Sequence, residues 1–222
     1  MAIELFWSSG SAYAWRVLLT LEVKGLPYES HLLEFSKDQH RTPAYLALNP
    51  RGRIPTLRDG GYVVYESIAI MAYLDRQHPT PPLFGVTPEE TGQVWRVISE
   101  AASYLDGPVE DFILPLYRGQ TQEPDKAAEV RTALPRIHEE LGRIEAALHG
   151  GPWLATAALS AADIAVFPLV KSILRAAGKP GADAFGPGLL PFAEKYPSIS
   201  RWLHRVEALP GYERTYPPHW RG

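Results

Sequence analysis

A proline-rich stretch, His78-Pro79-Thr80-Pro81-Pro82, divides the sequence into two parts with different residue patterns. Proline fixes φ and lacks a backbone donor, so neither a helix interior nor a central strand continues through such a run. Before this stretch, strand-like and helix-like segments alternate, whereas every periodic segment after it is helical. We therefore expect an α/β domain over residues 1–78, a linker over 79–88 and an all-helical domain over 89–222.

The first part contains the segments of a small sheet covered by helices. The apolar run 3–7 predicts a buried strand, residues 12–24 a helix and residues 28–33 a second strand. A strand–helix–strand unit of this kind crosses over right-handed and pairs its strands in parallel. Asp59-Gly60 between two apolar runs predicts a hairpin, because this dipeptide favours the positive φ angles of a tight turn. A helix over 67–76 follows the hairpin.

The second part begins its helices at capping motifs. Thr87-Pro88-Glu89-Glu90 and Ser160-Ala161-Ala162-Asp163 each place a hydroxyl at the cap and an acidic side chain three residues later. The helix that starts at the first motif is expected to be interrupted at Gly107-Pro108. The clearest apolar periodicity runs from Asp125 to His149, with a kink expected at Pro135. These segments predict an all-α helical bundle.

Composition excludes several kinds of function. The chain has no cysteine, which excludes disulfides, thiolate metal ligands and a redox pair of its own. With a net charge of −3 and no run of lysines or arginines, the chain lacks the positive charge that binding to nucleic acid or to an anionic membrane requires. No histidines form an i, i+4 pair, so no metal site is expected. The chain lacks a secretion signal and an apolar stretch of about 20 residues, so we expect it in the cytoplasm.

The candidate binding residues lie on either side of the hairpin. A cis bond before Pro55 would turn the Ile54 backbone outward, where it could pair with an extended peptide. Glu66 and Ser67 start a helix, where unpaired N–H groups favour a carboxylate and the Glu66 side chain favours an ammonium group. Together they fit an amino-acid zwitterion. Taken singly, each has a structural alternative, since most X-Pro bonds are trans and Ser67 could merely cap its helix.

Hydroxyl groups gather between the first strand and the first helix. Ser11 stands nearest the helix N-terminus, which would stabilise a thiolate, although this residue could equally serve only as the helix cap. His40 and Arg53 could bind a second carboxylate at the far end of a peptide, and Lys37 is an alternative residue for the same role. Each of these three is, singly, more often a solvated surface group.

Seven motifs of this chain occur in the order and spacing of one known family. They are Ser11 with Trp15-Arg16-Val17, then Lys24–Glu29, Asn49–Leu57, Glu66–Ile70, Tyr73-Leu74, Ser160–Asp163 and Tyr196–Ile199. The sequence thereby resembles the glutathione S-transferase family, with nearest similarity to serine-type, theta- and zeta-like bacterial members. Two departures exist: zeta members tend to have a Ser-Ser-Cys string where this chain has Ser11-Ala12-Tyr13, and the lack of cysteine sets aside the omega- and beta-like branches.

The resemblance implies a thioredoxin-like first domain that binds glutathione, a helical second domain and usually a homodimer. Ser11 would hydrogen-bond the glutathione sulfur, with Tyr13 or Ser9 as alternates. The remaining glutathione contacts would come from Ile54 and cis-Pro55 to the cysteinyl backbone, Glu66 and Ser67 to the γ-glutamyl end, and His40 and Arg53 to the glycine carboxylate. A hydrophobic substrate would meet aromatic and apolar residues that could equally be core or dimer-interface residues: Trp7, Tyr13, Tyr104, Phe112, Leu116 and Tyr117.

The implied activity is addition of the glutathione thiolate to a small hydrophobic electrophile. A free cysteine thiol has a pKa near 8.5, so a lowering by about two units would make the thiolate the main species. Glutathione would be the co-substrate, and no metal is required. Two alternatives stay open: a non-catalytic glutathione-binding or regulatory scaffold, and a glutathione-dependent isomerase, dehalogenase or peroxidase.

Overall fold

The computed structural model describes residues 3–221, which form two compact units. The first unit consists of Met1–Leu83 and Glu207–Gly222, and the second of Phe84–Val206. The residues from Glu207 onward, which the sequence pattern places in the helical domain, are thus grouped with the α/β residues. The expected fold class, an α/β first domain followed by a helical bundle, is confirmed.

The first unit is built on a four-stranded sheet with the order β2-β1-β3-β4. Its strands are β1 (Ile3–Trp7), β2 (Tyr28–Leu32), β3 (Thr56–Asp59) and β4 (Tyr62–Tyr65). As the sequence predicted, β1 and β2 are parallel, and β3 and β4 form an antiparallel hairpin. Alternate residues of β1 are buried, because successive side chains of a strand point to opposite faces.

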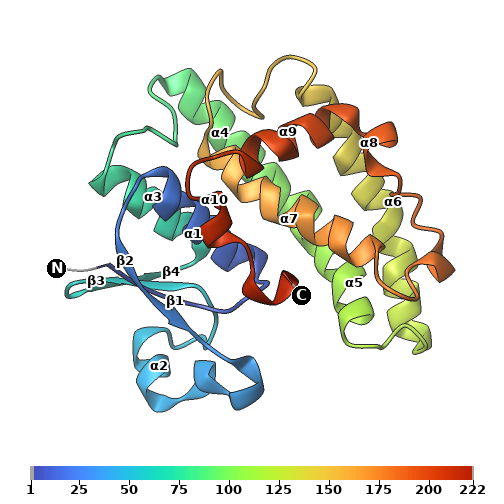
Figure 1. The fold of residues 1–222 in the computed structure, drawn as a ribbon, viewed down its shortest axis with the longest axis horizontal. Coiled ribbons are helices and arrows are strands. Elements are labelled where there is room, and N and C mark those ends of the chain that lie inside the picture. The colour runs from blue at the N-terminus through green and yellow to red at the C-terminus, as the bar shows by residue number, and fades with distance from the viewer. Residues whose placement is uncertain (1–2, 222) are drawn as a thin grey trace. The chain divides into compact units, whose positions relative to one another are not determined.

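Helices cover both faces of this sheet (Figure 1). α1 (Ala12–Val23) and α3 (Ser67–Gln77) pack against each other on one face, and α2 (Pro43–Leu48) lies on the other. Two short 3-10 helices, Phe35–Lys37 and Gln39–Arg41, lead into α2. The connections at the ends of β1 and β4 therefore deliver Ser11 and Ser67 to helix N-termini.

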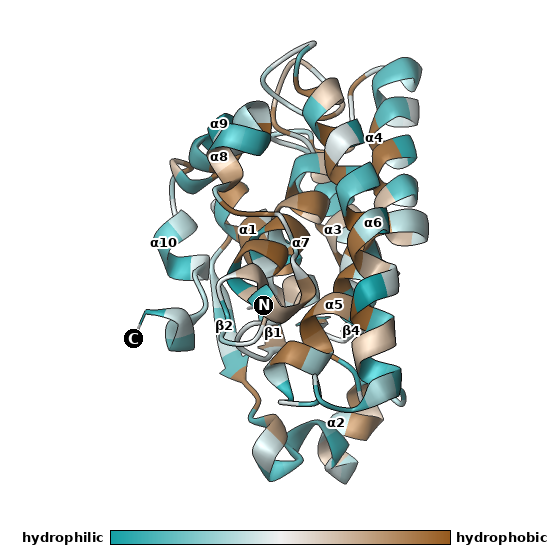
Figure 2. Cartoon of the chain, turned by 90° about the vertical axis from the view of Figure 1, so that its right-hand side faces the viewer, coloured by the Kyte–Doolittle hydropathy of each residue, from teal (hydrophilic) through white to brown (hydrophobic). Residues whose placement is uncertain are grey.

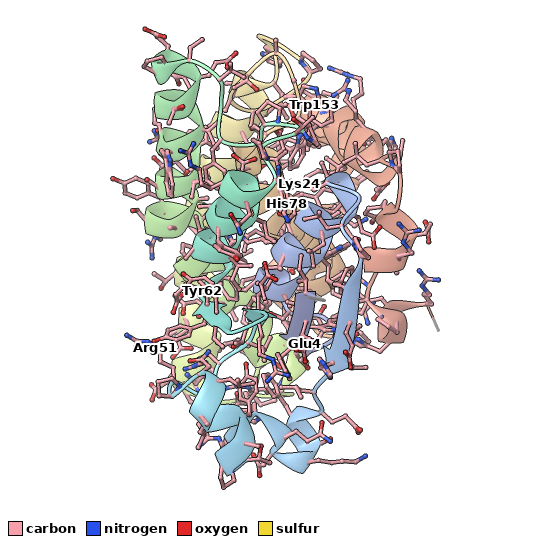
Figure 3. The ribbon with its side chains drawn as sticks, turned by 90° about the vertical axis from the view of Figure 1, so that its left-hand side faces the viewer. Glu4, Lys24, Arg51, Tyr62, His78 and Trp153 are labelled. Atoms are coloured by element: carbon pink, nitrogen blue, oxygen red, sulfur yellow. The ribbon has the colours of Figure 1, made fainter. Side chains whose placement is uncertain are left out.

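A buried lysine holds the proline-rich stretch against the first unit (Figure 3). The Lys24 Nζ atom lies 2.8 Å from an Asp75 carboxylate oxygen and donates to the carbonyls of His78 at 2.6 Å and Pro81 at 2.8 Å. Three acceptors around a fully buried ammonium group satisfy its three donors. The stretch is thus an anchored segment of the first unit.

The C-terminal residues pack on α1. α10 (Tyr212–Thr215) is followed by a 3-10 helix, Pro218–Trp220. The Trp15 indole N–H donates to the Thr215 hydroxyl at 2.8 Å, and Trp220 packs edge-on against the Trp15 ring at a centroid distance of 5.4 Å. Arg214 forms an ion pair with Glu22 of α1. These contacts make residues far apart in the sequence part of one core.

The second unit is helical throughout its regular structure. Its principal helices are α4 (Pro88–Glu100), α5 (Asp106–Tyr117), α6 (Pro124–Ala147), α7 (Ala161–Ala177), α8 (Phe192–Lys195) and α9 (Pro197–Glu207). α7 is buried along nearly its whole length and is hydrophobic over most of it (Figure 2), and both α4 and α5 pack against it. The sequence predicted a break at Gly107-Pro108, which lies instead inside α5. A π-helical turn, Ala101–Leu105, joins α4 to α5.

The two capping motifs form as the sequence predicted. Thr87 with Glu90 and Ser160 with Asp163 each make both hydrogen bonds of a capping box. Among the described residues, none of the helices is both long and apolar enough to cross a membrane.

Candidate functional site

The first unit contains a cavity of about 330 Å³ that brings together most of the predicted binding residues. Its lining residues are Ser11, Tyr13, Phe35, Asn49, Arg53, Ile54, Pro55, Glu66 and Ser67. We call this the Ser11 cavity. The loop after β1, the segment before β3 and the start of α3 all open onto it, although they are distant in the sequence.

Ser11 is the N-cap of α1 and keeps a hydrogen to donate. Its Oγ accepts from the Ala14 backbone N–H at 3.2 Å, and its φ of −74° and ψ of 118° are typical of a cap. A hydroxyl that accepts a capping bond still carries its own O–H donor. The helix N-terminus adds partial positive charge at the same place. Ser11 can therefore cap the helix and stabilise an anion at once.

The backbone before β3 is free to pair with an extended ligand. The Ile54–Pro55 bond is cis. Within residues 3–221, the N–H and C=O of Ile54 have no hydrogen-bond partner. The preceding carbonyl of Arg53 is fixed by two donors, the Asn49 side-chain amide at 2.8 Å and the Tyr45 hydroxyl at 2.5 Å. A fixed edge with an open donor and acceptor suits main-chain pairing with a short peptide.

The start of α3 offers both signs of charge. Ser67 is buried at the first helical position, and the Arg16 guanidinium, itself 3% exposed, donates to its hydroxyl at 3.5 Å. The same guanidinium lies over the Tyr13 ring at 4.9 Å. Glu66 is exposed and has a φ of 72°, in the left-handed region that L-residues rarely adopt. An unpaired helix start beside an exposed carboxylate can hold a carboxylate and an ammonium group together.

Three of the residues predicted to contact glutathione do not line the Ser11 cavity. His40 packs edge-on against the cavity residue Phe35 at 4.1 Å, and its Nδ1 is buried without a hydrogen-bond partner. Lys37 forms an exposed ion pair with Glu34 at 2.8 Å. Ser9 forms a hydrogen bond with the His219 ring at 2.6 Å.

The residues expected to meet a hydrophobic substrate are dispersed. Within the first unit, Tyr13 lines the Ser11 cavity, whereas Trp7 is buried in β1 and donates its indole N–H to Ser30 at 2.7 Å. In the second unit, Phe112 and Leu116 are buried. Lys179 lies 4.8 Å from the centre of the Tyr117 ring, and burial raises the pKa of that phenol. 

Tyr104 lines a different cavity of about 600 Å³ between α4 and α6. Its lining residues are partly apolar, such as Val97, Leu105 and Ile144, and partly charged. Most of the charged lining residues pair with one another, Arg96 with Glu100 at 2.7 Å and Arg143 with Glu139 at 2.7 Å.

Two cavity residues were missed from the sequence. Asn49 is 1% exposed and uses its amide to hold the segment before β3, and Phe35 forms part of the cavity wall from a 3-10 helix. Asn49 belongs to the motif Asn49–Leu57, so its position in a short Asn-Pro turn could have identified it as a residue that holds the segment before β3. Phe35 lies in an irregular segment without periodicity, and nothing in its neighbours distinguished it.

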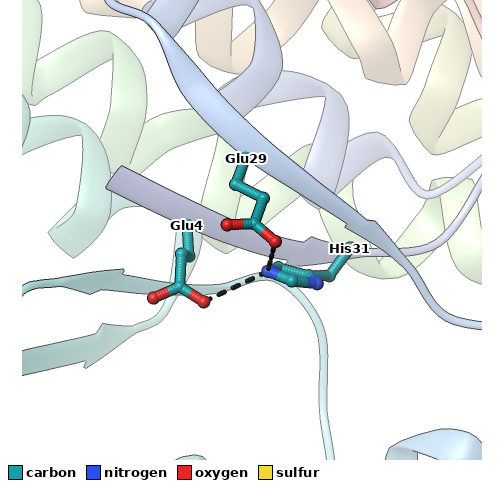
Figure 4. Close-up of side chains that lie close together, drawn as sticks. All are labelled: Glu4, Glu29 and His31. Carbon is teal, nitrogen blue, oxygen red and sulfur yellow. Dashed lines mark hydrogen bonds and ion pairs between the residues drawn. The ribbon is translucent and has the colours of Figure 1, made fainter. Parts of the chain in front are cut away.

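A cluster of potential metal ligands lies on β1 and β2 of the sheet (Figure 4). Ligand atoms of Glu4, Glu29 and His31 lie within 4.8 Å of one another. The Arg58 guanidinium donates two hydrogen bonds to the Glu4 carboxylate, at 2.7 and 2.6 Å, and holds the pKa of that carboxyl below its usual value. His31 also stacks on Phe6 at 4.5 Å. With Arg58 already neutralising Glu4, the cluster is an ion-pair network and gives no support for a metal.

Comparison with known proteins identifies similar chains over nearly the full length. Residues 10–77 match the family model of the glutathione S-transferase N-terminal domain, and residues 104–210 that of the C-terminal domain. Glutathione S-transferase hmp2 of Hypomyces subiculosus is 31% identical over 94% of each chain. Glutathione S-transferase A of Pleuronectes platessa is 29% identical, covering 98% of this chain and 92% of the relative. 

Among solved structures, a glutathione S-transferase from the Antarctic clam Laternula elliptica superposes with a TM-score of 0.79. It is 29% identical and covers all of this chain and 94% of its own.

Proposed function

Because this chain belongs to the glutathione S-transferase family, its activity is glutathione transfer, and we propose that Ser11 holds the co-substrate's sulfur as a thiolate. The observation that carries this proposal is the Ser11 cavity. It combines a hydroxyl donor at a helix N-terminus, an open backbone edge at Ile54 and a charged helix start at Glu66 and Ser67. Those three features correspond to the cysteinyl sulfur, the cysteinyl backbone and the γ-glutamyl end of γ-Glu-Cys-Gly.

The binding step uses groups that recognise the peptide rather than the reaction. Main-chain pairing with Ile54 would fix the cysteinyl residue, and the α3 N-terminus with Glu66 would hold the γ-glutamyl zwitterion. Arg53 would meet the glycine carboxylate, with His40 nearby. Such contacts are equal in the ground state and the transition state, so they contribute to affinity rather than to turnover.

The activation step depends on stabilising the anionic form of the thiol. Lowering a thiol pKa by two units requires about 2.7 kcal/mol, at about 1.4 kcal/mol per unit. A hydrogen bond to a charged group contributes about 1.5–3 kcal/mol, and a helix N-terminus about 0.3–1 kcal/mol. The helix end alone is insufficient, so the Ser11 hydroxyl must supply most of the effect. The thiol proton passes to solvent as the thiolate forms. The thiolate sulfur then forms a bond to the electrophilic carbon. In a conjugate addition the carbon–carbon π bond opens and the adduct takes a proton from solvent, whereas in an aromatic substitution the bond to the leaving group breaks and that group departs as an anion.

Several finer properties belong to the same proposal. We place the chain among serine-type, theta- or zeta-like bacterial members, acting as a cytoplasmic homodimer on small hydrophobic electrophiles. The apolar contribution to the electrophile's site would include Tyr13 from the Ser11 cavity. The scaffold, isomerase, dehalogenase and peroxidase alternatives are not favoured over transfer. Sedimentation equilibrium tests the dimer, and a panel of electrophiles tests the substrate class.

Replacing Ser11 tests the activation step. We expect Ser11→Gly to lower kcat about 10- to 100-fold, because loss of the charge-assisted hydrogen bond raises the thiol pKa by one to two units. Glycine suits this test because it costs only a few tenths of a kcal/mol as a helix cap, whereas alanine costs about 1 kcal/mol. Steady-state kinetics at about pH 6, where little thiolate forms in the variant, give the largest contrast.

Ser11→Thr is the matched control, since it keeps both the cap and the hydroxyl. It should retain most of the wild-type kcat. Glutathione affinity at about pH 6 should be similar in all three proteins, because there the thiolate contributes little to binding. A Ser11→Gly enzyme with wild-type kcat would assign the role to another hydroxyl, with Tyr13 and Ser9 the next to replace.

A further inference from the structure

The loop that carries Ser11 is a tight turn from Ser8 to Ser11. The Ser11 N–H donates to the Ser8 carbonyl at 3.4 Å, and Gly10, the third residue of the turn, has a φ of 83°. A positive φ at this position is the mark of a type II turn, which requires glycine or asparagine. The fourth residue is Ser11, so the conformation of the turn decides where the Ser11 hydroxyl lies.

A single side chain, His219, contacts both central residues of this turn. Its Nδ1 lies 2.6 Å from the Ser9 Oγ. A Cβ built on Gly10 would lie 2.7 Å from His219 Cε1 and 3.2 Å from Nε2, too close for any side chain to fit without displacing the ring. Gly10 thus has two reasons to be glycine, its positive φ and the approach of the imidazole.

The direction of the hydrogen bonds around this imidazole is set by Trp220. The Trp220 indole N–H can only donate, and it donates to His219 Nε2 at 3.0 Å. Nε2 is therefore the unprotonated nitrogen, and the ring proton is on Nδ1, where it is donated to Ser9. Because Ser9 accepts from His219, its own O–H is not donated to this imidazole.

Trp220 itself is fixed by the core of the first unit. Its ring packs edge-on against Trp15 of α1 at 5.4 Å and against Tyr216 at 6.0 Å. Trp15 is buried and also bonds Thr215. The imidazole is therefore held by a continuous series of contacts that runs from α1 through the C-terminal segment to the turn.

We propose that His219 is a positioning residue for catalysis: through Ser9 and Gly10 it holds the Ser8–Ser11 turn so that the Ser11 hydroxyl meets the substrate sulfur. This inference rests on the proposed function of Ser11. It adds a requirement that the Ser11 cavity alone does not contain, since His219 does not line that cavity.

The test is a set of variants followed by the ultraviolet absorbance of bound glutathione thiolate against pH. We expect His219→Ala to raise the thiol pKa in the complex by about one unit, which lowers the thiolate fraction and kcat about tenfold at about pH 6. Glutathione Kd at that pH should stay within about twofold, because the thiolate contributes little to affinity there. His219→Asn should restore most of the effect, since its amide can donate to Ser9 from nearly the same position.

Two further variants separate positioning from general stability. Gly10→Ala acts on the turn itself, because the added Cβ would both displace the imidazole and strain the φ of 83°, and it should shift the thiol pKa at least as far as His219→Ala does. Arg221→Ala is the matched control, because Arg221 lies in the same C-terminal segment but, among the described residues, contacts Tyr216 and Glu213 and no residue of the Ser8–Ser11 turn. It should leave the thiol pKa and kcat unchanged. 

Lower melting temperatures with an unshifted thiol pKa in both His219→Ala and Gly10→Ala would overturn the proposal. Should His219→Ala fail to fold, the Gly10→Ala and His219→Asn pair still decides the question. Failure of wild-type protein to bind glutathione by calorimetry would instead refute the proposed function, so the two failures are distinguishable.

Discussion

At the scale of single residues, the Ser11 cavity contains a strained backbone position. Glu66 has a φ of 72° and a ψ of 115°, outside the regions that L-residues favour. Such conformations cost about 1–3 kcal/mol and persist where surrounding structure holds them, often at functional sites. Here the strain places Glu66 at the N-cap of α3, with its carboxylate beside the helix start. The strained backbone at Glu66 thus lowers the stability of the fold and positions its carboxylate beside the helix start.

Glu66→Gly should therefore make the protein more stable and a weaker binder. Glycine adopts positive φ without a Cβ clash, and after its extra entropy in the unfolded chain is subtracted we expect a gain of about 1 kcal/mol. Loss of the carboxylate should raise the glutathione Kd about tenfold, with kcat at saturation nearly unchanged. Urea denaturation and calorimetry measure the two effects. A decrease in stability would show that Glu66 is not strained.

Much of the Ser11 cavity could be predicted at this scale. Ser11, Ile54, Pro55, Glu66 and Ser67 were predicted because each stands where a strand meets a helix or a turn, which local patterns reveal. Asn49 and Phe35 were missed because their roles depend on which distant backbone they reach. The hydrogen bond between His219 and Ser9 joins residues 210 positions apart, and no local sequence pattern predicts a contact over that separation.

At the scale of elements, the two capping boxes have the same local form in different surroundings. Thr87 and Glu90 cap α4 at an exposed position. Asp163 is fully buried and accepts hydrogen bonds from the backbone N–H groups of Leu154 and Ser160 and from the Trp202 indole, all at 2.9 Å. Burial raises the pKa of Asp163, and these hydrogen bonds oppose that rise. The second box thus joins three segments, whereas the first only starts a helix.

Alanine substitutions should separate these two roles. We expect Thr87→Ala to cost about 1 kcal/mol, the usual value of a cap. Asp163→Ala should cost more than about 3 kcal/mol, because it leaves several buried donors without an acceptor at about 1–3 kcal/mol each. Chemical denaturation of both variants gives the comparison. Equal losses would mean that the buried box acts only as a helix cap.

The sequence predicted elements better than their joints. Both capping boxes and the hairpin at Asp59-Gly60 were readable because their signals lie within four residues. The π-helical turn at Ala101–Leu105 was not predicted, because it is displaced from the residue that disturbs the helix: Pro108 lacks an N–H, and its ring clashes with the helical carbonyl of Tyr104, four residues earlier and inside this turn. Gly107-Pro108 was interpreted as a break, yet the first turn of a helix tolerates proline, and α5 begins at Asp106.

At the scale of the whole molecule, stability should depend on pH through carboxylates that accept backbone hydrogen bonds. Glu145 of α6 accepts from the N–H groups of Ser198 at 2.8 Å and Ile199 at 2.9 Å, at the start of α9. Partial burial tends to raise the pKa of Glu145, but these hydrogen bonds outweigh it and hold the pKa below the ordinary value of 4.5. The ionised carboxylate therefore stabilises the fold.

Glu145→Gln should remove an acid-sensitive part of that stability. Since the folded pKa lies below the unfolded one, the contribution is complete above about pH 4.5 and is lost as pH falls through the folded value. The wild-type protein should be more stable than the variant at neutral pH, and their stabilities should become equal at acid pH. Thermal melts between neutral and acid pH measure this. 

Glu139→Gln, at an exposed pair with Arg143, is the control and should change stability little at any pH. A constant difference between wild type and Glu145→Gln at all pH values would mean that Glu145 acts through shape rather than charge.

The most direct test of the account is a pH titration of the ultraviolet absorbance of glutathione bound to wild-type protein, with S-methylglutathione as the blank. Calorimetry first establishes that both ligands bind. We expect a thiolate band that titrates about two units below the free thiol, and its loss near neutral pH in Ser11→Gly. A bound thiol that titrates like the free one would contradict the claim that this cysteine-free chain activates a sulfur supplied by its ligand.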